Sequence, residues 1–385
     1  MSEVRTILET ARSRRDEWVN LLGEIVNIDS GPGDAAGINR VYGVLDAVLT
    51  DLGFVSERVS TPGPDVYVAR RRGQGDSPRV ALIGHADTVF AKGTVDERPF
   101  TREGDRVRGP GVADMKGGLV VALAGLDLAG PAVLDRLDLT VIVNGDEESG
   151  SADSRAVIEE LAPGFDITLV FEPGRPADGF VVSRRGAHRF EVAVTGRPAH
   201  TGVNPDDGAN AIETAAHHIL AIQDLGRSIP DATVNAVMIS GGTRPNIVPE
   251  HARIRVDSRF DNDAGEQAVV AGMRELEGPG PVDGTTTTVR SLDQRPAFEA
   301  RPQAAALAQL VVEVGRELGF ALTGESTGGS SDGNFTSAAG IPTIDGLGAV
   351  GHDYHTPEEY VLADSIPQRA AVLGVLLDRI GDGLS

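Results

Sequence analysis

The stretch Val80-Ala81-Leu82-Ile83-Gly84-His85-Ala86-Asp87 is the part of this sequence that is most informative about the fold. A short apolar run that ends in a glycine is typical of a strand buried on both faces of a parallel sheet. Ligand sites in open α/β sheets lie at the carboxyl ends of such strands. His85 therefore stands where a binding site is expected, although a surface histidine at a capped strand end gives the same pattern.

The segments around this strand repeat its alternation with helices. Strands are predicted at 66–69, 139–143 and 167–171, and helices at 3–28, 115–128 and 153–161. Alternating strands and helices predict a mostly parallel sheet with helices on both faces. The same pattern returns after Pro296, with helices at 301–318 and 363–380 and a short strand at 343–344.

The middle of the chain has a different order of elements. Strands are predicted at 189–195, 233–240, 251–260 and 285–292, helices at 208–225 and 264–276, and a Gly/Pro-rich loop at 277–284. The order β-α-β-β-α-β is that of the ferredoxin-like unit. We therefore predict an α/β domain formed by residues 1–185 and 297–385, with an α+β domain, 186–296, inserted into it.

The composition limits the classes of function. The 385-residue chain is 40% hydrophobic and has no cysteine, so any metal must be held by His, Asp or Glu. The net charge of −22 argues against nucleic acid and anionic membranes as partners. No apolar run suggests a membrane helix, and the N-terminus lacks the apolar core of a signal peptide, so we expect a cytoplasmic protein.

Further acids follow the other predicted strands. Asp114 stands at the mouth of a predicted helix, Glu147 and Glu148 follow strand 139–143, and Glu172 follows strand 167–171. Two of these have a plain alternative: Asp114 could be a helix N-cap, and Glu147 and Glu148 could form a solvated acidic turn. Together they predict a metal site, because adjacent acids repel one another unless a cation is near.

A distal loop supplies the remaining candidate ligand. His355 lies in the loop 351–359, where His352 and Asp353 are competing candidates. One carboxylate that bridges two ions, with two more ligands on each, would use five residues. The set is His85, Asp114, Glu148, Glu172 and His355. Oxygen and imidazole ligands suit two zinc ions per subunit, with Co²⁺ or Mn²⁺ as substitutes.

The motifs together resemble a known family. They are GHADTV (84–89), GVADMKGG (111–118), GDEESGS (145–151), FEPG (171–174), GRPAHTG (196–202), GGTRPNIVP (241–249), GGSSDGNF (328–335) and GHDYHTPEEY (351–360). In this order they resemble the di-zinc exopeptidase family of carboxypeptidase G, aminoacylase, acetylornithine deacetylase and succinyl-diaminopimelate desuccinylase. The resemblance covers nearly the whole chain.

The resemblance implies roles for residues of the α/β domain. It implies that His85 and Glu172 hold one zinc, that Glu148 and His355 hold the other, and that Asp114 bridges them. Glu147 is similar to the family's general base, and Asp87 to the residue that orients His85. The family also implies a cis peptide bond between Asp114 and Met115.

The inserted domain resembles the family's lid and dimerisation domain. His200 is similar to the residue that reaches the partner subunit's site in a homodimer and stabilises the oxyanion. The substrate-binding residues implied by the resemblance are Asn246, Arg259, Arg295 and the loop around Gly329.

The function expected from these features is that of a di-zinc metallo-carboxypeptidase or amidohydrolase. A carboxypeptidase G-like enzyme would release a C-terminal amino acid from a peptide or N-acyl amino acid. The alternative within the enzyme class is a deacylase of the acetylornithine or succinyl-diaminopimelate kind. Two non-enzyme classes are less consistent with the sequence. A scaffold that had lost catalysis would not need Glu147. A two-lobed periplasmic-type binding protein would not need five metal-type ligands at strand ends.

Overall fold

The computed structural model describes residues 3–383, which fall into two units. The first unit contains Met1–Ser183, Ala300–Thr327 and Ser331–Ser385, and the second contains Arg184–Glu299 and Gly328–Ser330. The second unit interrupts the first, and its main segment begins two residues before the predicted inserted domain and ends three residues after it. The short segment Gly328–Ser330 belongs to the second unit and was expected in the α/β domain.

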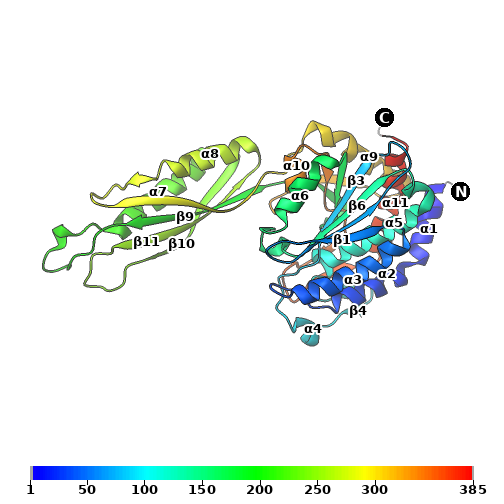
Figure 1. Cartoon of the computed structure of the whole chain (residues 1–385), viewed down its shortest axis with the longest axis horizontal. Helices are drawn as coiled ribbons and strands as arrows, with labels where there is room; N and C mark the ends of the chain where they lie inside the picture. The colour runs from blue at the N-terminus through cyan, green and yellow to red at the C-terminus, as the bar shows by residue number, and fades with distance from the viewer. Residues whose placement is uncertain (1–2, 384–385) are drawn as a thin grey trace. The chain divides into compact units, whose positions relative to one another are not determined.

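A six-stranded sheet forms the centre of the first unit (Figure 1). Its order is β1 (Val55–Val59), β2 (Val66–Arg71), β6 (Asp138–Asn144), β3 (Arg79–His85), β7 (Ile167–Val170) and β15 (Thr343–Ile344). Strands β6, β3, β7 and β15 pair in parallel, whereas β2 pairs antiparallel with both β6 and β1. The predicted mostly parallel sheet is confirmed, and β2 makes it a mixed one.

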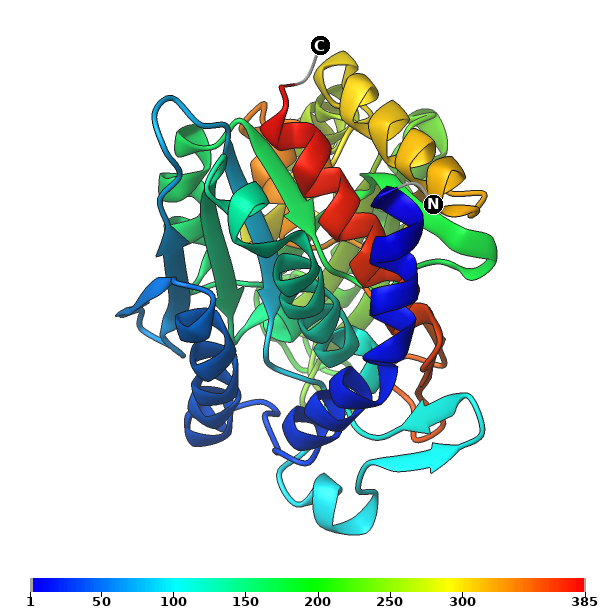
Figure 2. The same ribbon diagram turned by 90° about the vertical axis from the view of Figure 1, so that its right-hand side faces the viewer.

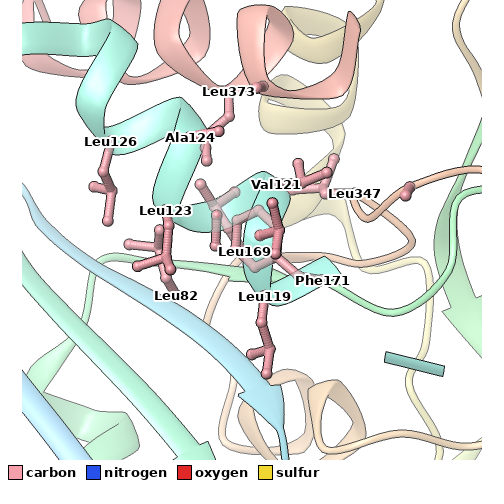
Figure 3. Close-up of a cluster of buried hydrophobic side chains, with 14 of the residues drawn as sticks. Leu82, Leu119, Val121, Leu123, Ala124, Leu126, Leu169, Phe171, Leu347 and Leu373 are labelled. Atoms are coloured by element: carbon pink, nitrogen blue, oxygen red, sulfur yellow. The ribbon is translucent and has the colours of Figure 1, made fainter. Parts of the chain in front are cut away.

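Helices cover both faces of this sheet. One face packs against α5 (Gly117–Leu134), where Leu82 of β3 and Leu169 of β7 meet Val121 and Leu123 in the main core (Figure 3). On the other face, Ala81 and Ile83 belong to a second cluster with residues of α6 (Arg155–Leu161) and α10 (Gly333–Ala338). Successive residues of β3 thus enter different cores, as expected for a strand buried on both faces.

The first and last helices of the described residues pack together in the first unit. Helix α1 (Glu3–Ser13) packs along α11 (Ser365–Gly381), and α11 packs against α5 and α9 (Pro302–Leu318) (Figure 2). The other helices of this unit are α2 (Arg15–Val26), α3 (Ala35–Asp51) and α4 (Thr94–Glu97). The predicted helix 3–28 is therefore two helices with a break at Arg14, and α3 and β1 were not predicted.

One segment among the described residues, Val112–Leu134, is long and apolar enough to cross a membrane by length and composition alone. The sequence had indicated no such segment. Its most apolar window is 61% buried inside the protein, and α5 packs against α11 in the main core. These properties are those of a core helix.

The second unit has its own sheet and its own core. Its elements are β9 (Gly186–Thr195), α7 (Ala211–Ser228), β10 (Ala232–Gly241), β11 (His251–Phe260), α8 (Asp263–Arg274), β12 (Gly278–Pro279) and β13 (Thr286–Arg295). The antiparallel sheet has the order β10-β11-β9-β13-β12. This confirms the ferredoxin-like prediction, except that the predicted loop 277–284 contains the short strand β12.

Two small sheets complete the structure. One contains β4 (Thr101–Glu103), β5 (Arg106–Arg108), β16 (Gly351–His352) and β17 (Tyr360–Leu362), and the other contains β8 (Gly179–Arg184) and β14 (Thr323–Thr327). Strand β17 lies beside the turn Val112–Lys116 that precedes α5. The loop 351–359 is thereby brought next to the segment that contains Asp114.

Candidate active site

Three adjacent parallel strands of the first unit carry candidate residues at their carboxyl ends. His85 is the last residue of β3, Glu147 and Glu148 form a turn just after β6, and Glu172 lies two residues beyond β7. Because β6, β3 and β7 are neighbours, their ends lie at one edge of the sheet. Asp114 joins them from the turn before α5.

The carboxylate of Asp114 lies between two histidines. Its Oδ1 is 3.3 Å from Nε2 of His85, and its Oδ2 is 3.1 Å from Nε2 of His355. His85 Nε2 is also 3.8 Å from Oε1 of Glu172, and His355 Nε2 is 3.1 Å from Oε2 of Glu148. The cluster therefore consists of two His–Glu pairs that share one aspartate. The peptide bond between Asp114 and Met115 is cis, as the resemblance implied.

The charges in this cluster require compensation. Although burial opposes the shift, hydrogen bonds from both histidines hold the pKa of Asp114 well below its usual range. Hydrogen bonds to Asp114 and Glu148 raise the pKa of His355 to about 10. Burial raises the pKa of Glu148, whose Oε1 is buried and accepts no hydrogen bond within the described residues. The hydrogen bonds from the two imidazoles thus offset part of the negative charge of the three carboxylates.

The donors fit a metal centre. Single ligand atoms of His85, Asp114 and Glu148 lie within 4.8 Å of one another, and Glu172 and His355 contact the same group. Two imidazoles and three carboxylates form a set that suits a zinc-type ion, and one of these carboxylates has a buried oxygen with no hydrogen bond among the described residues. The residues present therefore fit the metals that the sequence analysis expected.

Asp87 connects His85 to the turn that contains Glu147. His85 Nδ1 is 3.0 Å from the backbone oxygen of Asp87 and 3.3 Å from its Oδ1. The carboxylate of Asp87 also accepts the backbone N–H groups of Glu147 at 3.2 Å and Glu148 at 2.9 Å. Since Nδ1 of His85 has an acceptor, a neutral His85 would keep its proton on Nδ1, and Nε2 would be the nitrogen that binds a metal.

The loop 351–359 turns one of its three candidates toward the cluster. Asp353 and His355 both have left-handed backbone conformations, with φ of 60° and 63°. The Tyr354 hydroxyl donates to the Gly351 carbonyl at 2.7 Å, and the ring of His352 packs on Tyr360. Among the three, His355 is the one whose side chain is found against Asp114 and Glu148 in the described structure.

Two buried charged residues near the cluster were missed by the sequence analysis. Glu359 is 1% exposed, and its carboxylate accepts backbone N–H groups of Gly111, Ala113 and Asp114. Lys116 is equally buried and donates to the Ile28 carbonyl at 2.8 Å. Burial raises the pKa of Glu359 to about 7 and lowers that of Lys116 to about 7. Their positions inside the motifs GVADMKGG and GHDYHTPEEY were the only signal in the sequence.

The second unit contains the remaining predicted residues. It brings His200 and Asn246 together, because His200 pairs with Ile247 and Thr201 donates its N–H to the Asn246 carbonyl. His200 is exposed, and the N–H of Gly202 donates to its Nδ1 at 3.1 Å. The proton of a neutral His200 is therefore assigned to Nε2, which is left as a hydrogen-bond donor.

The predicted arginines of the second unit differ in their surroundings. Arg259 makes two hydrogen bonds to Asp257, of 3.0 and 3.1 Å, so its guanidinium already has an acidic partner. Arg295, at the end of β13, is 7% exposed. The Gly329 carbonyl accepts a hydrogen bond of 3.1 Å from Arg184, an arginine that the sequence analysis had not assigned to the site.

Comparison with known proteins establishes the family. The model of peptidase family M20/M25/M40 matches residues 81–379, a range that includes all five candidate metal ligands. The chain belongs to this family. It is a hydrolase of the metallopeptidase class, which confirms the predicted enzyme class and the predicted resemblance.

Individual relatives cover nearly the whole chain. Carboxypeptidase G2 of a Pseudomonas species (strain RS-16) is 32% identical over 384 residues, covering 98% of this chain and 92% of the relative. A succinyl-diaminopimelate desuccinylase of Methylobacterium radiotolerans is 30% identical, covering 87% of this chain and 91% of the relative. The solved structure of a Bacillus subtilis protein described as a dinuclear metal binding peptidase of family M20 shares the fold, with a TM-score of 0.71, 16% identity and coverage of 97% and 99%.

Proposed function

We propose that this chain is a two-metal amide hydrolase that holds both ions through one shared carboxylate. The main support for this proposal is that the two oxygens of Asp114 face different histidines, each of which contacts a different glutamate. The proposed ligands of one ion are His85, Glu172 and Asp114, and those of the other are Glu148, His355 and Asp114. Two zinc ions bound there would polarise an amide carbonyl and acidify a water molecule.

Glu147 is the proposed general base. It follows β6 in the same turn as Glu148, and its backbone is held by Asp87, which also contacts His85. A base in this position takes a proton from the attacking water and passes it to the leaving amine. Asp87 then has two roles: it orients the imidazole of His85, and it holds in place the turn that contains the general base.

The proposed substrate is a small peptide or N-acyl amino acid with a free C-terminal carboxylate. The similarity to carboxypeptidase G2 along 98% of the chain supports this choice. Buried Arg295 is suited to bind such a carboxylate, with Asn246, Arg259 and the loop at Gly329 as further contacts. The alternative is a deacylase, which the 30% identity to a succinyl-diaminopimelate desuccinylase supports.

We further propose a homodimer in which the second units contact each other. Strand β10 is an edge strand, and Val237, Met238 and Ile239 on it are all more than half exposed. On α7, Leu220 is 66% exposed. Pairing of two identical edges would cover these side chains in a two-fold contact. His200, with its Nε2 proton exposed, would then donate to the oxyanion in the partner subunit's site.

A substrate screen with zinc-loaded protein tests the proposed activity. We expect release of an amine or amino acid from N-acyl amino acids and dipeptides, and loss of that release after treatment with a chelator. Matched substrates with amidated C-termini should react far more slowly, because they lack the charge that Arg295 binds. Equal rates on free and amidated substrates would contradict the carboxypeptidase assignment, and preference for N-succinyl-diaminopimelate would favour the deacylase.

A further inference from the structure

Glu359 is a buried acid whose two carboxylate oxygens both accept hydrogen bonds from backbone N–H groups. Its Oε1 accepts the N–H groups of Ala113 at 2.8 Å and Asp114 at 3.0 Å, and its Oε2 accepts that of Gly111 at 3.2 Å. A buried carboxylate is costly unless hydrogen bonds stabilise it. Here it is stabilised by N–H groups of one short segment, 111–114.

These hydrogen bonds connect two distant parts of the chain. Glu359 lies four residues after His355 and immediately before β17, whereas the three N–H groups belong to residues 111–114, at the start of the turn Val112–Lys116. The Asp114 N–H and the Glu359 carboxylate are separated by 245 residues in sequence. The same two segments supply Oδ2 of Asp114 and Nε2 of His355, which are 3.1 Å apart.

We propose that Glu359 is a positioning residue that sets the place of Asp114 relative to His355. The inference rests on the proposed two-metal function, in which these two side chains share an ion. Glu359 acts through the backbone of residues 111–114. Its neighbour Glu358 has a side chain that is 77% exposed and is the natural control.

The substitution Glu359→Gln separates this role from simple packing. Glutamine has nearly the volume and shape of glutamate, so no cavity is expected. It offers one acceptor oxygen and an NH₂ group in place of two acceptors. The NH₂ group must face either the Gly111 N–H or the N–H groups of Ala113 and Asp114, so at least one buried donor loses its acceptor.

The experiment compares wild-type protein, Glu359→Gln and Glu358→Gln. Zinc content and zinc dissociation constants are measured by competition with a chromophoric chelator, and the visible absorption of Co²⁺-loaded protein reports ligand geometry. For Glu359→Gln we expect zinc binding that is weaker by about 10- to 100-fold for at least one ion, the range seen when a partner that orients metal ligands is removed. We also expect a changed Co²⁺ spectrum, while Glu358→Gln matches the wild type in both.

Each remaining outcome has a defined meaning. Wild-type zinc affinity and a wild-type Co²⁺ spectrum in a folded Glu359→Gln protein would overturn the positioning role. If the wild type itself takes up fewer than two zinc ions, the proposed function fails first, and the inference fails with it. Thermal unfolding of the metal-free proteins checks that each variant is folded. If Glu359→Gln does not fold, Glu359→Asp is measured in its place. Failure of both to fold would also contradict the proposal, because it would assign Glu359 to the stability of the fold.

Discussion

Asp114 shows how individual residues determine the chemistry of this site. An aspartate in the turn before a helix is by itself an ordinary N-cap. Here its two oxygens contact His85 and His355, and its backbone N–H donates to Glu359. The side chain is thereby directed into the cluster, where it carries a negative charge that the two histidines stabilise.

The protonation of the histidines predicts the pH behaviour of metal uptake. The pKa of His355 is raised to about 10, so this imidazole is protonated at pH 8 in the metal-free protein, and hydrogen bonds to Asp114 and Asp87 shift the pKa of buried His85 in the same direction. Because zinc binds only the neutral imidazole, uptake must release protons and must weaken as the pH falls. Titration calorimetry in buffers of different ionisation enthalpy measures this. A binding heat that is the same in every buffer would show that the histidines are already neutral.

Glu147→Gln separates catalysis from metal binding. The substitution removes the proposed base and leaves the five proposed ligands in place, so zinc content should be unchanged. We expect turnover to fall by about 10²- to 10⁴-fold, the usual contribution of a general base. Glu160→Gln, an exposed position on α6, is the control. Retention of more than about a tenth of wild-type activity by Glu147→Gln would exclude the role.

At the scale of elements, the site depends on the close packing of α5 beneath the strand ends. A Cβ atom on Gly118, in the first turn of α5, would lie 1.8 Å from the backbone oxygen of Phe171, which precedes Glu172. Glycine is therefore required where the helix that follows Asp114 meets the end of β7. The two segments can approach closely only without a side chain at this position.

Gly118→Ala tests this contact. We expect a loss of about 1–3 kcal/mol in the free energy of unfolding, as for other overpacked cores, together with weaker zinc binding. Gly43→Ala is the control, because Gly43 is an exposed position within α3 with no atom within 4 Å of the added Cβ, and it should be neutral or stabilising. Chemical denaturation of the metal-free proteins gives both values. A fully stable Gly118→Ala protein would contradict the argument.

The elements also show what the sequence could predict. The alternating pattern located β3, β6, β7 and the ferredoxin-like unit, because their apolar periodicity is strong and local. It missed the break at Arg14, which falls inside a continuous amphipathic pattern, and it missed α3 and β1. It could not identify Glu359 either, because an acid buried against backbone N–H groups contributed by a distant segment has the same local pattern as an exposed one such as Glu358.

At the scale of the whole molecule, the apolar edge of the second unit is the main unexplained surface. Of the seven large hydrophobic residues that are exposed among the described residues, six belong to the second unit: Val203, Ile212, Leu220, Val237, Met238 and Ile239. Isolated exposed apolar residues need no explanation, but three in succession on an edge strand favour a partner.

The double substitution Val237→Lys and Ile239→Lys should therefore give a monomer. Light scattering after size-exclusion chromatography measures the mass, and circular dichroism checks the fold. If His200 acts across the interface, this monomer should also lose turnover while it keeps its zinc. Val55→Lys, on the exposed edge strand β1 of the first unit, is the control and should leave the mass unchanged. A wild-type protein that is monomeric and fully active would exclude the proposed dimer.

The central claim is that Asp114 joins two metal ions, and anomalous diffraction from zinc-loaded crystals tests it most directly. The account predicts two zinc peaks per chain, with one oxygen of Asp114 on each, His85 and Glu172 on the first ion, and Glu148 and His355 on the second. A single ion, both Asp114 oxygens on one ion, or His352 or Asp353 in place of His355 would contradict it.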